Sequence, residues 1–327
     1  MHVGGPDGAI AARAVIDCCG TWSAPNPAGA HGLRAPGEAA CADRIAAGIP
    51  DVLGADRNAH AGRTTLVVGA GHSAMNVVLD LATLAEQAPG TRILWAFRRP
   101  LGAVNFGGGA PDGLAQRGAL GARAQGLIES AAVTALGPFL IDRIAAQDGR
   151  LAVSGRQEGR STTVIADRIV TAAGFRPDLS FLREVRLGLD PAVEATPVLA
   201  PLIDPNLQSC GTVRPHGAAE LRHPEKDFWI AGMKAYGRAP TFLPATGHEQ
   251  VRSIVAAIAW AGLPLVLGLP PNRFLVPQAP PAAPTEAAPA VGGEAPPPRC
   301  SVPARWRRAS PSSGGCWNRR ASAWRWR

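Results

Sequence analysis

The pattern of hydrophobic and polar positions is clearest in the stretch from residue 64 to residue 99. Residues 64–69, Thr-Thr-Leu-Val-Val-Gly, form a short β-branched apolar run, as expected of a strand buried on both faces. Apolar positions at helical spacing follow over residues 72–87, and Pro89-Gly90 ends that predicted helix. Residues 91–97 return as a second strand, so the pattern predicts a β-α-β unit.

Weaker apolar runs elsewhere predict further short strands and one more helix. The strands are expected at the end of residues 9–17, at 150–155, at 163–171 and at 228–231, and the helix at about residues 247–261. The segment from residue 101 to 126 is rich in glycine and gives no assignment. Strands that alternate with helices around the first unit indicate an α/β protein with a parallel sheet.

The end of the chain differs from the rest in composition. Residues 270–298 are dominated by proline, alanine, glycine and glutamate, and residues 299–327 are rich in arginine, tryptophan and serine, so we expect a linker and a disordered tail. The formal net charge of +8 equals the eight arginines of residues 299–327, which leaves residues 1–298 formally neutral. The folded body therefore carries no nucleic-acid signal, and a tail that contacts nucleic acid or an anionic surface is a separate hypothesis.

Cysteine usage and apolar runs bear on the compartment. None of the six cysteines forms a C-x-x-C pair, and no pairing with histidine indicates a zinc site. No signal peptide is visible at the start, and the most apolar stretch, residues 254–269, is interrupted by Gly262 and Pro264. We expect a cytoplasmic protein with reduced thiols, no bound metal and no membrane span.

The turn between the first strand and its helix carries the clearest chemistry. Residues 69–74, Gly-Ala-Gly-His-Ser-Ala, read G-x-G-x-x-A at a strand-to-helix junction. Gly69 allows the tight turn, Gly71 lets a pyrophosphate approach the backbone, and Ala74 keeps the helix close to the sheet. The N–H groups and positive dipole at the helix start are expected to hold the phosphates. The expected cofactor contacts of this turn are Gly69, Gly71, His72, Ser73 and Ala74.

The end of the second strand distinguishes the two nicotinamide dinucleotides. An NAD site places Asp or Glu there to bond the ribose 2′-hydroxyl, whereas NADP sites place arginine against the 2′-phosphate. This chain has Arg98 and Arg99 and no acid between residues 91 and 104. A guanidinium bonds a phosphate bidentately, and a carboxylate repels it. We expect NADP rather than NAD, selected by Arg98 or Arg99.

Two segments on either side of this unit, which we call the crossing segments, carry a family resemblance. The first covers residues 15–25, and the second covers residues 169–178 and matches A-x-G-[FY]-x-x-[ND]. With the G-x-G-x-x-A unit between them, the chain resembles the two-dinucleotide flavoproteins, which include flavin-containing monooxygenases and thioredoxin-reductase-like FAD/NAD(P)-dependent oxidoreductases. In that superfamily an NADP domain is inserted into an FAD domain, and small residues such as Gly20 and Gly174 let the two strand ends meet at the crossing.

The resemblance implies a Rossmann-like NADP domain inserted in an incomplete FAD domain. Residues 1–60 and 171–265 would belong to the FAD-binding domain, residues 61–170 to the NAD(P)-binding domain, and residues 266–327 to the linker and tail. The family's FAD-binding G-x-G-x-x-G unit does not precede the first crossing segment in this sequence, so we expect a truncated chain. The lack of a redox C-x-x-C argues against disulfide reductase chemistry.

The last part of the resemblance concerns the flavin. Residues 228–234 resemble the family's final FAD segment, with Met233 where many relatives have an aspartate. Thr246-x-x-Glu249 reads as a capping box for a helix whose N-terminus would face the flavin. A capped helix that packs on the sheet without a flavin is the other interpretation. The expected flavin contacts in this part are Gly232, Met233, Thr246 and Gly247.

The resemblance implies an NADPH-dependent flavoprotein oxidoreductase or monooxygenase that passes hydride from NADPH to FAD and on to oxygen or another small-molecule acceptor. No catalytic residue follows from the sequence, although Lys234, Arg238 and His248 lie near the expected flavin edge. His60 and His72 are candidates for cofactor contacts or ordinary loop histidines. The alternative is a truncated, catalytically inactive remnant that binds NADP without turnover. A homodimer is one assembly that the resemblance allows.

Overall fold

The computed structural model describes residues 1–5, 8–100, 115–208, 213–260 and 325–326 of the 327-residue chain. The predicted linker and tail lie outside these ranges, except for two residues that we predicted to be disordered. These two residues form strand β13 (Arg325–Trp326), so the prediction of disorder is wrong for them. Strand β13 pairs with one edge of β1 (His2–Gly5), and β2 (Gly8–Ala11) pairs with the other edge, both antiparallel.

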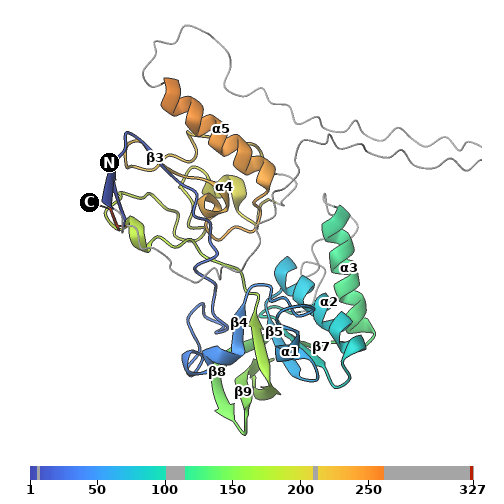
Figure 1. Cartoon of the computed structure of the whole chain (residues 1–327). Coiled ribbons are helices and arrows are strands. Elements are labelled where there is room, and N and C mark those ends of the chain that lie inside the picture. Colours follow the sequence, from blue (N-terminus) through green and yellow to red (C-terminus); the bar gives the residue numbers. More distant parts are fainter. Residues whose placement is uncertain (6–7, 101–114, 209–212, 261–324, 327) are drawn as a thin grey trace, which may run out of the picture. The chain divides into compact units, whose positions relative to one another are not determined.

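A five-stranded parallel sheet organises the middle of the chain (Figure 1). In spatial order its strands are β4 (Ile45–Ala47), β11 (Arg168–Thr171), β5 (Thr64–Val68), β6 (Arg92–Ala96) and β7 (Thr134–Leu136). Helix α2 (His72–Gln87) connects β5 to β6, and α3 (Ala115–Glu129) precedes β7 and lies beside α2. The predicted β-α-β unit is confirmed, and α2 has the predicted bounds.

Each face of this sheet is covered by a different layer. Val67 and Trp95 pack under α2 and α3 together with Met75 of α2. Leu66 and Ile169 pack on the other face, against a three-stranded antiparallel meander. The meander consists of β8 (Phe139–Gln147), β9 (Arg150–Gln157) and β10 (Arg160–Ala166). Because neighbouring residues of a strand point to opposite faces, both faces of β5 are buried, and three of its four buried residues are apolar, with Thr65 the exception.

Two predictions about elements need correction, and the pairing of one strand is added to them. The strand predicted over residues 163–171 is two strands, β10 and β11, because the chain leaves the meander at Asp167 and enters the parallel sheet. The second predicted helix, α5 (Pro244–Trp260), begins three residues earlier than expected. Strand β4, in the part we assigned to the FAD-binding domain, pairs with β11 at the edge of the parallel sheet.

A second, smaller sheet brings together distant parts of the chain. Strand β3 (Val15–Asp17) pairs in parallel with β12 (Phe228–Ile230), both at predicted positions. Around them lie α4 (Ala200–Ile203), the 3-10 helix η4 (Gly232–Tyr236) and α5, and the three residues of β12 are buried among them. The remaining short helices are η1 (Ala39–Arg44), α1 (Arg57–His60) and η3 (Ser180–Leu182). In the described ranges no helix has the length and hydropathy needed to cross a membrane.

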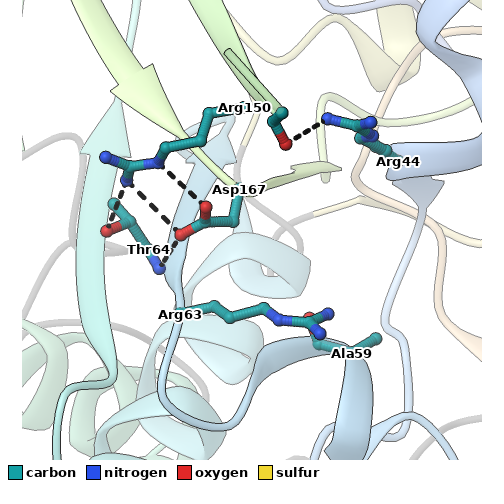
Figure 2. A network of polar contacts seen from close by, with 7 residues as sticks. Arg44, Ala59, Arg63, Thr64, Arg150 and Asp167 are labelled. Carbon is teal, nitrogen blue, oxygen red and sulfur yellow. Dashed lines mark hydrogen bonds and ion pairs between the residues drawn. The ribbon is translucent and has the colours of Figure 1, made fainter.

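A polar network aligns β11 with β5 at their amino ends (Figure 2). Asp167 accepts the backbone N–H of Thr64 at 2.7 Å and forms an ion pair with Arg150 at 2.9 Å, and the same guanidinium donates to the Thr64 hydroxyl at 3.1 Å. Partial burial alone would raise the pKa of Asp167, but the Thr64 amide and Arg150 outweigh it and lower that pKa. The network therefore sets the register that brings the opposite ends of both strands together at the candidate site.

Candidate functional site

The turn from β5 into α2 is held tightly by its neighbours. Gly69 has φ +133°, and a Cβ built on it would lie 2.3 Å from the carbonyl oxygen of Ala172, directly after β11. The indole N–H of Trp95 donates to the Gly69 carbonyl at 2.7 Å, and the Gly69 amide donates to Ala96 at 3.0 Å. Only glycine fits this conformation and this close approach of two strand ends.

The next glycine, by contrast, faces open space. Gly71 is the N-cap residue of α2, is exposed, and a Cβ on it would meet no atom within 4 Å. The N-cap residue provides no side-chain cap, and the first turn of the helix contains no acid. Ala74 is fully buried against the sheet, whereas His72 and Ser73 are half-buried. The position of Gly71 at the start of α2 is therefore open, as the approach of a phosphate to a helix N-terminus requires.

Both arginines expected to select the cofactor follow the end of β6. Arg98 and Arg99 are exposed, and β6 ends beside β5 because Ala96 pairs with Val68. The Arg98 guanidinium donates to the carbonyl of Ala30 at 3.3 Å. In the ranges that the structure describes, neither arginine forms an ion pair with a carboxylate. Two cationic side chains are therefore available at the strand end where a dinucleotide ribose would lie.

The two crossing segments lie against each other. The Asn26 amide donates to the Gly174 carbonyl at 2.9 Å, Pro25 and Phe175 form an antiparallel bridge, and the rings of Trp22 and Phe175 stand 5.2 Å apart. Gly20 and Gly174 have φ of +71° and +87°, which favours glycine at both positions. The two crossing segments therefore meet, and the side chains that make the contact include the large residues Trp22 and Phe175.

Residues 232–233, which the resemblance places at the flavin, form hydrogen bonds within the protein. The Gly232 amide donates to the buried Gln250 side chain at 2.7 Å, and Met233 sulfur accepts from the Thr21 hydroxyl at 3.3 Å. Gly232 has φ +74° and open space where its Cβ would be, and its Cα lies 4.0 Å from a Cβ built on Gly247. The structure thus brings Gly232 beside the start of α5, as the sequence predicted, but occupies the polar groups there.

The predicted capping box at Thr246 is wrong. Helix α5 begins at Pro244, so Thr246 and Gly247 lie inside its first turn. Their amides both donate to the Leu243 carbonyl, at 3.0 and 3.2 Å. A proline at the first position suits a helix start without a side-chain cap, which the sequence pattern did not take into account. The first turn of α5 therefore offers few free donors.

Lys234 does not lie at a cofactor edge either. Its ammonium is fully buried, forms an ion pair with Asp17 at 2.7 Å and lies 4.2 Å from the ring centre of Phe181. Asp17 also accepts the Cys19 amide at 3.0 Å. Burial, the Asp17 hydrogen bond and its charge raise the pKa of Cys19 to about 11. The pair of Asp17 and Lys234 joins the end of β3 to the middle of η4, while Arg238 and His248 are exposed.

Among the residues whose burial the structure describes, three histidines are buried. His60 is the last residue of α1, His223 lies outside the helices and strands, and His216 accepts from Gln250 at 2.8 Å through Nε2 while Nδ1 donates to the Arg214 carbonyl at 3.1 Å. Burial is the main cause that lowers the pKa of each. The Nδ1 atom of His60 lies 2.9 Å from the hydroxyl of Thr65 in β5, so the buried His60 side chain packs against the sheet. It is therefore neither a cofactor contact nor a loop histidine.

The described residues fit one cofactor better than the other. The β5–α2 turn supplies the close strand approach, the open glycine and the uncapped helix amides that a dinucleotide pyrophosphate needs. For FAD, the donors near Gly232 and the first turn of α5 are already bonded within the protein. These residues do not by themselves fit a flavin held by polar contacts.

The protein is an α/β protein with parallel sheets. Its fold resembles that of the two-dinucleotide-binding flavoprotein reductases. No protein-family model matches the sequence, and no curated protein matches it.

Particular solved structures match the fold. Bacillithiol disulfide reductase from Bacillus cereus has a TM-score of 0.56 at 16% identity, over 80% of this chain and 66% of that one. L-lysine 6-monooxygenase from Pseudomonas syringae has a TM-score of 0.53 at 14% identity, over 80% and 67%. Thioredoxin reductase from Lactococcus lactis has a TM-score of 0.50 at 14% identity, over 78% and 69%. At these identities the likeness shows the fold, and the chain spans just under two thirds of the first protein's length.

Proposed function

We propose that this chain is an NADPH-dependent oxidoreductase of the flavoprotein reductase and monooxygenase kind. The observation that carries the proposal is the pair of glycines in the β5–α2 turn. Gly69 is forced by the approach of the Ala172 carbonyl, while Gly71 leaves open the space that a pyrophosphate would occupy. A turn that merely joined a strand to a helix would need the first glycine but not the second.

The choice of NADPH over NADH rests on charge at the end of β6. Arg98 and Arg99 are exposed, and the neighbouring α2 start has no acid in its first turn. The electrostatic potential there favours an additional phosphate, since an acid that would bond a ribose 2′-hydroxyl is missing from residues 91–100.

Bound NADPH would supply the hydride for reduction of a small-molecule acceptor. The chain's own contribution would be to bind and orient the dinucleotide. The amides of His72 and Ser73 would hold the phosphates, and Ala74 would keep α2 against the sheet. No side chain is required as an acid or base in hydride transfer.

A titration of the full chain with NADPH and NADH, followed by calorimetry, tests the proposal. We expect NADPH to bind more tightly than NADH. The double variant Arg98→Ala with Arg99→Ala should weaken NADPH binding by about 10- to 100-fold and leave NADH nearly unchanged, because charge-assisted hydrogen bonds to the 2′-phosphate are lost. Arg156→Ala, which removes an exposed arginine from the meander, is the matched control. Equal affinities of the wild type for both dinucleotides would refute the selection of NADPH.

Binding of NADPH without turnover is the second candidate function. It is favoured by the internal bonds of Gly232 with Gln250 and of Lys234 with Asp17, which engage polar groups expected near a flavin. The absorption spectrum of the purified chain separates the two candidates. A flavin band that NADPH bleaches supports the oxidoreductase, and NADPH binding by a protein that neither retains nor accepts added FAD supports the second candidate.

A further inference from the structure

One cationic side chain at the start of α2 was not singled out by the sequence. Arg117, in the first turn of α3, lies against the imidazole of His72, the first residue of α2. The Arg117 Nε donates to His72 Nε2 at 3.0 Å, and Arg117 Nη2 lies 3.1 Å from His72 Nδ1. Both side chains are half-buried. Because a guanidinium only donates and a neutral imidazole has one acceptor nitrogen, the Nε contact is the hydrogen bond, and the Nη2 contact is a close approach of the guanidinium to the ring.

This placement costs free energy in the absence of an anion. A helix N-terminus carries a partial positive charge, so cations are favoured at the other end of a helix. The first turns of α2 and α3 contain no acid, and no ion pair of Arg117 is formed within the part of the chain that the structure describes. A half-buried guanidinium against the side chain of the first residue of α2 adds its charge to the positive end of that helix, and such a combination of charges favours an anion.

We propose that Arg117 binds the pyrophosphate of the dinucleotide and that His72 positions it. The inference rests on the proposed function, because it assumes that the phosphates lie at the start of α2. The new part of the inference is that different arginines bind different phosphates of the dinucleotide. Arg117 would contact the phosphates that NADPH and NADH share, whereas Arg98 or Arg99 would contact the 2′-phosphate that only NADPH has.

The role of His72 follows from hydrogen-bond chemistry. A ring nitrogen that accepts the Arg117 Nε–H must carry a lone pair, so the imidazole is neutral in this arrangement. Phenylalanine at this position would offer no acceptor, whereas glutamine would keep one. His72 is thus a positioning residue that acts through Arg117.

Calorimetric titration of the full chain with NADPH, NADH and adenosine 2′-monophosphate tests the inference. We expect Arg117→Gln to raise the Kd of both dinucleotides by the same factor, about 10- to 100-fold, and to change the Kd of the monophosphate, which has no phosphate at the 5′ position, much less. Arg117→Lys, which keeps the charge, should lose part of this affinity. Arg123→Gln, which removes an exposed arginine from the same helix, is the matched control and should stay within about twofold.

The outcomes separate this inference from the proposed function. Wild-type affinity for both dinucleotides in Arg117→Gln, with circular dichroism showing a folded protein, overturns the role of Arg117 and leaves the proposed function intact. A loss confined to NADPH also overturns it, because Arg117 would then contact the 2′-phosphate. A wild type that binds neither dinucleotide overturns the proposed function itself. For His72, we expect His72→Phe to weaken binding, His72→Gln to restore part of it, and neither to add to the effect of Arg117→Gln.

Discussion

The two glycines of the β5–α2 turn make opposite predictions for the same substitution. In Gly69→Ala the new methyl would lie 2.3 Å from the Ala172 carbonyl oxygen at a φ of +133°. A non-glycine residue in such a conformation costs about 1–3 kcal/mol, and overpacking against a backbone oxygen costs about 1–3 kcal/mol more. We therefore expect an unfolding free energy lower by about 2–6 kcal/mol and a melting temperature lower by at least about 4 °C.

Gly71→Ala is the matched control, two residues along the chain. Its φ of −88° suits any residue, and its methyl would meet no atom within 4 Å. Stability should stay within about 1 kcal/mol of wild type. The methyl would instead block the pyrophosphate, so NADPH affinity should fall by about 5- to 100-fold.

Thermal melting and calorimetry on both variants give the readout. Gly69→Ala should lose stability, and Gly71→Ala should lose binding while it keeps stability. A Gly69→Ala protein that melts like wild type would refute the reasoning about the strand approach. A Gly71→Ala protein that binds NADPH like wild type would refute the placement of the pyrophosphate.

Three further predictions concern groups outside the turn. Lys234→Met should lower the unfolding free energy, measured by urea titration, by about 3–5 kcal/mol because it leaves the Asp17 carboxylate buried without its ion-pair partner. The double variant Asp17→Leu with Lys234→Met should recover most of that loss. A Lys234→Met protein as stable as wild type would contradict the role of the ion pair. The pKa values of the three buried histidines are lowered in the folded chain, so the unfolded chain binds protons more readily. The unfolding free energy should therefore be highest above about pH 6.5 and should fall below that pH by up to about 1.4 kcal/mol per pH unit for each histidine. An unfolding free energy that does not change from pH 7.5 to 5.5 would be inconsistent with their burial. With a pKa of about 11, Cys19 should react with iodoacetamide about tenfold faster per unit between pH 8 and 10, and peptide mapping that shows a plateau by pH 9 would disprove it.

Periodicity predicted the parts of the fold whose burial is regular. Strand β5 is buried on both faces and α2 on one, so their patterns of apolar residues reveal both type and bounds. Strand β8 escaped prediction because Asp142 and Arg143 are exposed in its middle, where its register with β9 shifts and the alternation breaks. Helix α3 contains three glycines, at 118, 121 and 126, and lacks a clear apolar stripe.

The candidate site was predictable only where its residues are consecutive. The G-x-G-x-x-A turn is local, and the parallel order of strands then places Arg98 and Arg99 near it. Arg117 follows a segment without recognisable periodicity, so nothing in the sequence indicated that it contacts His72. The pairing of Asp17 with Lys234 joins positions far apart along the chain, and no local pattern could have shown that Lys234 is buried.

The contact between the crossing segments has a consequence for how the chain could be divided. The Asn26 amide lies 2.9 Å from the Gly174 carbonyl, so the chain enters and leaves the parallel-sheet region at almost one point. The region between those residues is therefore a cassette with adjacent ends. Residues 27–173 could be removed as a unit, and residues 26 and 174 could be joined by a linker of a few residues. Cleavage of only one of the two connections would leave the two parts covalently joined through the other.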